Sequence, residues 1–184
     1  SRRASRADRA DALAKIRQMG LAVLHYPTEH NGKLPPLFPG QVLEYEPGRG
    51  GRIVTECADY LAIDKAGGRH VVTRLMPRAY LRVKEPGNHA AMRVYVMNSK
   101  VTNGSGDVIA PFGRVVTAGQ PPVGAVPFNV IGARAGVPIM TGADQLEPDV
   151  ATAPWKTNTP SSPPLGDCRA VFLFDGSAGL QQIP

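Results

Sequence analysis

The chain has 184 residues, with 21 Lys and Arg against 15 Asp and Glu, and a formal net charge of +6. This length fits one domain with a sizeable core, and no run approaches the roughly 18 consecutive apolar residues of a membrane span. The 20 glycines and 18 prolines exceed average usage but stay below the level of a low-complexity segment. We therefore expect a folded domain rich in turns and short strands.

The first seventeen residues form a basic arm. It holds six cationic residues against only Asp8 and Asp11, namely Arg2, Arg3, Arg6, Arg9, Lys15 and Arg17. Such an arm contacts the phosphates of nucleic acid or lipid head groups, or it forms an ordinary solvated helix face. A third interpretation is that it continues from an upstream segment. The sequence leaves all three open.

Apolar residues three and four positions apart predict a helix within residues 1–32. The predicted packing face consists of Leu13, Ile16, Gly20, Val23 and Leu24. The polar start of the helix is expected to project into solvent. Pro27 lacks a backbone donor, so the helix should end or kink near Tyr26, with Asn31 and Gly32 as the stop.

From residue 33 onward the pattern changes to short strands separated by Gly, Pro and Asn, which is typical of an antiparallel sheet. The predicted strands cover residues 41–46, 70–75, 79–83, 92–97, 108–109, 114–117 and 126–131. Residues 56–63 are ambiguous and could form a short helix. Residues 149–166 are rich in Pro, Thr and Ser and indicate a long surface loop.

The end of the chain predicts a hairpin. Residues 170–174 are apolar and aromatic, Asp175 and Gly176 form a turn pair, and residues 178–183 resume a weaker strand. The first strand is apolar on both faces, so it should lie inside the sheet. The predicted fold is one α+β domain over residues 1–184, with an N-terminal helix (1–32) packed on an antiparallel β-sheet with long Pro/Gly-rich loops (33–184).

Cys57 and Cys168 are the two cysteines. They could form a disulfide, as suits an exported protein, or remain two separate buried thiols. Neither belongs to a CxxC pair, so a zinc or redox site has no local support.

Three segments resemble prepilin-type proteins of the planctomycete and verrucomicrobial kind, which are type IV pilin-like or type II secretion pseudopilin-like. Residues 11–36, DALAKIRQMGLAVLHYPTEHNGKLPP, resemble the family's segment after its membrane helix. The matching residues are Ile16, Gln18, Gly20, Leu21, Ala22, Tyr26, Asn31, Gly32, Pro35 and Pro36. Residues 93–99, RVYVMNS, resemble a strand ending in SYxMN, and residues 170–176, AVFLFDG, resemble the closing NVLFxDGHV.

This resemblance implies a pilin-like head domain without its membrane helix, acting as a structural subunit of a pilus-like or pseudopilus filament. Its expected partners are other pilin-like subunits, and its expected location is the inner membrane facing the periplasm, or the cell surface. We expect a structural protein rather than an enzyme, with no cofactor and no metal site.

The sequence offers weaker support for other function classes. A hydrolase would need a converging nucleophile and base, for which Cys57 with His70 or His89 is the conceivable pair. His25 and His30 are five apart and would share a helical face poorly, which disfavours a metal site. Asp144, Glu147 and Asp149 could line a calcium loop or simply be exposed acids. The glycine-rich residues 48–51 lack a GK[ST] ending, so they indicate a loop rather than a phosphate cradle.

Two further binding roles remain open. The basic arm supports a nucleic-acid-binding module, although low aromatic content and the lack of a recognised motif argue against specific binding. An adhesin-like head would use surface loops such as residues 149–166.

Overall fold

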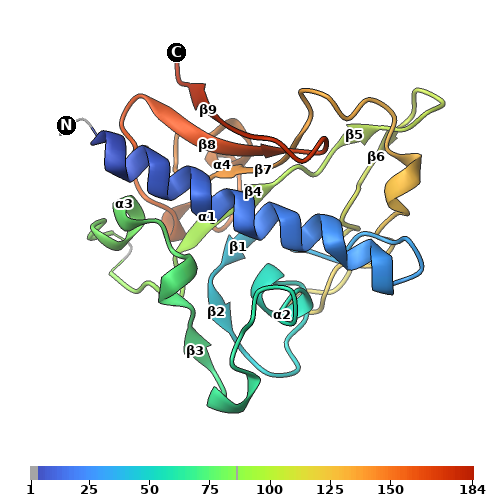
Figure 1. Cartoon of the computed structure of the whole chain (residues 1–184), viewed down its shortest axis with the longest axis horizontal. Coiled ribbons are helices and arrows are strands. Elements are labelled where there is room, and N and C mark those ends of the chain that lie inside the picture. Colours follow the sequence, from blue (N-terminus) through green and yellow to red (C-terminus); the bar gives the residue numbers. More distant parts are fainter. Residues whose placement is uncertain (1–3, 86) are drawn as a thin grey trace.

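The computed structural model describes residues 4–85 and 87–184, and it shows a mixed α+β fold. One long helix, α1, runs across the front of a five-stranded antiparallel sheet (Figure 1). Two small two-stranded sheets and several short helical turns complete the fold. The expected layout of an N-terminal helix on an antiparallel sheet is thus confirmed at the level of fold class.

Helix α1 covers Arg6–His25, and its start and end follow from local chemistry. The Ser5 hydroxyl accepts a hydrogen bond from the Asp8 backbone N–H at 3.1 Å, and the Asp8 carboxylate accepts one from the Ser5 backbone N–H at 3.1 Å. This capping box satisfies two donors that the first turn leaves free. A 3-10 turn over Tyr26–Glu29 follows, and Asn31 and Gly32 then take positive φ angles of 53° and 75°.

The main sheet has the order β1-β4-β7-β8-β9, and every neighbouring pair is antiparallel. Its strands are β1 Gly40–Val42, β4 Arg93–Met97, β7 Pro138–Gly142, β8 Cys168–Leu173 and β9 Ala178–Gln182. Strand β8 lies between β7 and β9, so the first strand of the C-terminal hairpin is inside the sheet, as its apolar character predicts.

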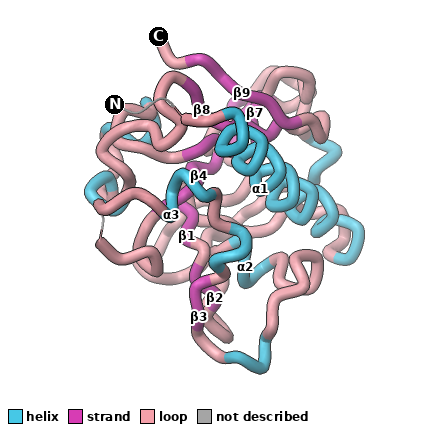
Figure 2. Tube along the Cα trace, turned by 60° about the vertical axis from the view of Figure 1, so that its left-hand side comes forward, coloured by secondary structure: helices cyan, strands magenta, loops and turns pink. Residues whose placement is uncertain are grey.

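The remaining elements sit around this sheet. Strand β2 (Glu44–Tyr45) pairs with β3 (His70–Val71), and β5 (Val101–Thr102) pairs with β6 (Val108–Ile109). Figure 2 shows the β2–β3 pair at the opposite end of the molecule from β8 and β9. The short helices are α2 Ile53–Glu56, α3 Arg78–Leu81 and α4 Pro148–Ala151, and the further 3-10 turns are Lys65–Gly67, Thr73–Leu75, Phe128–Val130 and Lys156–Asn158.

Several strand predictions were wrong. Residues 79–83 fall mostly in α3, residues 126–131 contain a 3-10 turn, and residues 114–117 contribute only the isolated bridge of Arg114 to Val123. Both turns begin directly after a proline, Pro77 and Pro127, whose fixed φ favours a tight turn over a strand. Strand β7 was missed because it also begins at a proline.

The buried face of α1 differs from the predicted one. Ile16, Gly20 and Val23 are buried, whereas Leu13 and Leu24 are only half-buried. Buried residues that the prediction left out are Asp8, Ala12, Met19 and Ala22. The start of the helix therefore packs on the domain rather than projecting into solvent, which corrects that expectation.

Gly20 brings the helix into direct contact with the sheet. A Cβ atom at Gly20 would lie 2.1–2.4 Å from three ring carbons of Phe172 in β8, which is far inside van der Waals contact. Phe172 is fully buried. The missing side chain at Gly20 thus sets how close α1 approaches β8.

We expect Gly20→Ala to destabilise the protein by about 1–3 kcal/mol, because the added methyl forces Phe172 or the helix to move. Gly179→Ala in β9 is the matched control, because nothing lies within 4 Å of that position. Denaturant melts of both variants measure the difference. A double variant with Phe172→Leu should recover part of the loss, and an unchanged midpoint for Gly20→Ala would contradict this packing.

Two carboxylates fasten the first half of α1 to α3 and its neighbouring residues. Asp8 pairs with Arg82 at 2.5 Å, and Asp11 accepts a hydrogen bond from the Arg78 backbone N–H at 2.7 Å. The hydrogen bond from Arg82, and then the one from Ser5, lowers the pKa of the Asp8 carboxyl. A carboxyl whose pKa is lower in the folded state stabilises the fold above its unfolded pKa, and this stabilisation is lost as the pH falls through the folded pKa.

We therefore expect Asp8→Asn to lower the free energy of unfolding at pH 7 and to have a smaller effect near pH 2.5, in urea melts at both values. Asp149→Asn is the control, because that side chain makes no hydrogen bond or ion pair among residues 4–85 and 87–184. An equal loss at both pH values would show that the Asp8 charge contributes nothing.

Candidate functional site

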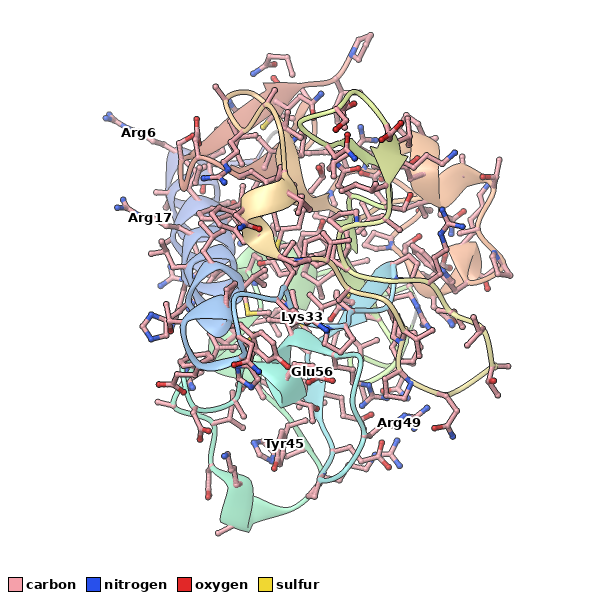
Figure 3. The ribbon with its side chains drawn as sticks, turned by 90° about the vertical axis from the view of Figure 1, so that its right-hand side faces the viewer. Arg6, Arg17, Lys33, Tyr45, Arg49 and Glu56 are labelled. Carbon is pink, nitrogen blue, oxygen red and sulfur yellow. The ribbon has the colours of Figure 1, made fainter. Side chains whose placement is uncertain are left out.

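The basic arm does not form one continuous cationic surface. Arg9 pairs with Asp167 at 2.6 Å, and the Lys15 ammonium donates to the Arg74 backbone carbonyl. Arg6 and Arg17 are exposed and point away from α1 (Figure 3). Arg2 and Arg3 lie outside the described residues. Four of the six residues of the predicted basic arm are therefore placed, and two of those four side chains face solvent.

The outward face of α1 mixes small and apolar side chains with polar ones, and the exposed Arg17 and Gln18 lie between Ala14 and Leu21 on it. Ala7, Ala10, Ala14 and Leu21 are all exposed, and their spacings of three, four and seven residues place them on one side of the helix. Leu21 is 45% exposed and is the largest apolar side chain among them. We call these four residues the outer stripe.

Both cysteines are free thiols and fully buried. Cys57 follows α2 and Cys168 begins β8, so the alternative of two separate buried thiols holds in this structure. Burial raises the pKa of each thiol, Cys57 strongly. Within the described chain no hydrogen bond joins Cys57 to a histidine, and the His70 ring instead bonds the Gly68 carbonyl. The structure thus does not assemble the conceivable Cys–His pair.

The two early histidines make ring contacts. His25 meets Tyr60 edge-on with ring centroids 4.6 Å apart, and His30 stacks on Tyr26 at 3.5 Å. Across residues 4–85 and 87–184, no three His, Cys, Asp or Glu side chains gather in a way that could hold a metal ion.

Two of the acidic residues at 144–149 make structural contacts, and Asp144 is buried rather than exposed as the second interpretation expected. Asp144 is fully buried, and its two carboxylate oxygens accept hydrogen bonds of 2.6 and 2.8 Å from Arg169 in β8. Glu147 caps α4 by accepting from the Asp149 and Val150 backbone N–H groups. A calcium ion would have to displace both sets of partners.

We expect Asp144→Asn to cost about 3–5 kcal/mol, because it leaves the Arg169 guanidinium buried without its counter-charge. The paired change Asp144→Leu with Arg169→Met should recover most of this loss, since it removes both charges. Chemical denaturation measures both. Adding calcium to the unmodified protein should leave the melting temperature unchanged, and a clear calcium-dependent rise would reverse this interpretation.

On the side of β1 and β4 lies a cavity of about 650 Å³ that the sequence did not indicate. Four arginines line it, namely Arg49, Arg52, Arg69 and Arg93, and we call it the arginine pocket. Antiparallel pairing of Val42 with Arg93 brings the arginine of β4 beside β1. Trp155, which follows α4, forms part of the opposite wall, with the Arg93 guanidinium 5.5 Å from its ring centroid.

Two glutamates partly balance these charges. Glu44 bonds Arg69 through both oxygens, at 2.8 and 3.2 Å, and also pairs with Arg52 at 3.2 Å. Glu46 pairs with Arg49 at 3.0 Å. The hydrogen bond from Arg69 is the main cause that lowers the pKa of the Glu44 carboxyl.

Sequence reasoning missed the arginine pocket because its residues are spread from position 38 to 155. No sequence motif links them, and the densest run of positive charge lies at the N-terminus instead. The available signals were four arginines between residues 49 and 93 and the single tryptophan of the chain. Neither signal says which residues meet in space.

Comparison with known proteins identifies no relative: no family model, no curated protein and no solved structure matches the chain.

Proposed function

We propose that this chain is the head domain of a pilin-like or pseudopilin-like subunit, and that it acts by packing against further copies in a filament. The observation that carries the proposal is the outer stripe of α1, which leaves small and apolar residues exposed along a helix whose opposite face is buried in the sheet. In the proposed assembly, α1 of one subunit meets α1 of the next along this stripe.

The packing of α1 supports this arrangement. The helix contacts β8 and β9 and is fastened at both halves, by Asp8 and Asp11 at its start and by Gly20 against Phe172 further on. A helix held this rigidly presents its outer stripe in one fixed orientation. Alanines at Ala7, Ala10 and Ala14 allow two helices to approach closely, because they add little volume between the backbones.

The chemistry at the start of α1 limits how an upstream membrane helix would join. The capping box of Ser5 and Asp8 marks the N-terminal boundary of α1. In this proposal, an upstream helix would therefore be separated from α1 by a break near Ser5. None of the helices in the described part of the chain has the length and hydropathy to cross a membrane. In this proposal the protein is exported and faces the periplasm or the cell surface, and it needs no cofactor.

A nucleic-acid-binding arm is the alternative. It is supported less well, because Arg9 and Lys15 are occupied by Asp167 and the Arg74 carbonyl. Electrostatic contact through Arg6 and Arg17 alone should be weak and should vanish near physiological salt.

The test is Leu21→Glu in cells that express the full-length protein. A charge in the outer stripe should lower the amount of the chain in filaments sheared from the cells at least tenfold, as measured by mass spectrometry. The melting temperature of the isolated head should stay unchanged, because Leu21 is exposed.

Val116→Glu is the matched control, since Val116 is an apolar residue that is 72% exposed and lies outside α1. It should enter filaments normally. The proposal fails if the unmodified chain is absent from every sheared fraction, or if Leu21→Glu assembles as well as the control.

A further inference from the structure

Arg93 is the least compensated cation of the arginine pocket. Among residues 4–85 and 87–184, its buried Nε atom has no hydrogen-bond partner, and its guanidinium has only the Ala91 backbone carbonyl, at 3.3 Å, as an acceptor. Within the same residues no carboxylate pairs with Arg93, whereas Glu44 pairs with Arg52 and Arg69, and Glu46 pairs with Arg49. A buried N–H group without an acceptor is costly, so the unpartnered Nε of Arg93 favours an anion from outside.

The neighbouring arginines also favour the binding of an anion. Four guanidinium groups meet two carboxylates in and beside the pocket, which leaves two positive charges in excess. Burial lowers the pKa of Arg93, and the charge of Arg52 lowers it further. Burial and then the charge of Arg49 do the same for Arg52. The cations therefore repel one another, and an anion between them would relieve that repulsion.

Apart from Glu44 and Asn88, the other residues that line the pocket are apolar or glycine. Phe38, Val42, Val115 and Trp155 contribute to its walls. A Cβ at Gly40 would lie 2.7 Å from Cδ of Arg93 and 3.0 Å from Cδ2 of Trp155, so the glycine makes room for the stacked pair. A volume of about 650 Å³ lies within the range of small-molecule sites.

We propose that the arginine pocket binds a small organic anion, in which a carboxylate or phosphate group is attached to a compact apolar or aromatic body. The anionic group bonds Arg93 together with Arg49 or Arg52, and the body packs on Trp155 and Phe38. Planar guanidinium groups bind both oxyanions through paired hydrogen bonds. The proposed anion site does not depend on filament assembly, because it lies beside the edge strand β1 and its neighbour β4, whereas the outer stripe lies on α1.

The test uses phenyl phosphate and benzoate as the two anionic probes, with benzyl alcohol as the neutral analogue and inorganic phosphate as the anion without a body. Trp155 is the only tryptophan, so its fluorescence reports on this pocket alone, and calorimetry provides a second measurement. We expect at least one aromatic anion to bind with a dissociation constant below about 1 mM and at least tenfold more tightly than benzyl alcohol or inorganic phosphate. The stronger of the two probes identifies the anionic group.

Arg93→Met should weaken binding at least tenfold. Arg134→Met is the matched control, because Arg134 also stacks on an aromatic ring, 4.2 Å from the Phe128 centroid, but lies outside the pocket. It should bind like the unmodified protein. If Arg93→Met does not fold, Arg49→Gln takes its place, because the Arg49 side chain is 47% exposed and its loss should weaken binding several-fold without changing the melt.

Three results would overturn the proposal. They are benzyl alcohol binding as tightly as the anions, unchanged affinity in folded Arg93→Met or Arg49→Gln, and no heat or fluorescence change with either aromatic anion up to 10 mM. Filament assembly can fail its own test without affecting any of these measurements.

Discussion

The contact between Gly20 and Phe172 fixes the geometry on which the other parts of the fold depend. It sets the distance from α1 to β8, and β8 in turn carries Arg169 to the buried carboxylate of Asp144. Strand β8 pairs with β7, β7 pairs with β4, and β4 pairs with β1, so the position of β8 also affects these strands. A helix held further from the sheet would leave Ile16 and Met19 without their packing partners. One absent side chain therefore determines how the two layers meet.

Periodicity in the sequence predicted the two ends of the chain well. The helix, its stop at Asn31 and Gly32, and the C-terminal hairpin with an internal first strand are all present. The burial of individual helix residues was predicted less well, because leucines were favoured over smaller residues. Burial follows distance from the sheet rather than side-chain hydrophobicity, so Ala12 lies in the core while Leu21 is exposed. The middle of the chain was predicted least well, since its prolines start tight turns as readily as they interrupt strands.

Charge gave the least information about sites. The cluster of arginines near the N-terminus is conspicuous in the sequence, yet Arg9 and Lys15 are used to fasten α1 to the domain. The arginines that share a cavity are separated by up to 44 residues, and they meet through the pairing of β1 with β4 and of β2 with β3. Such long-range pairing is decided by the whole sheet, and a local pattern of residues does not encode it.

The positions of the two chain ends have a practical consequence. In Figure 1 the start of α1 and the end of β9 lie toward the same side of the molecule, while the turn between β5 and β6 lies at the far side. A fusion partner added after Pro184 would therefore lie close to the start of α1. The turn at residues 104–106 is exposed, and Gly104 and Gly106 have open space around them. A peptide or label inserted there would extend away from both chain ends, which makes this turn the natural point for displaying a foreign epitope.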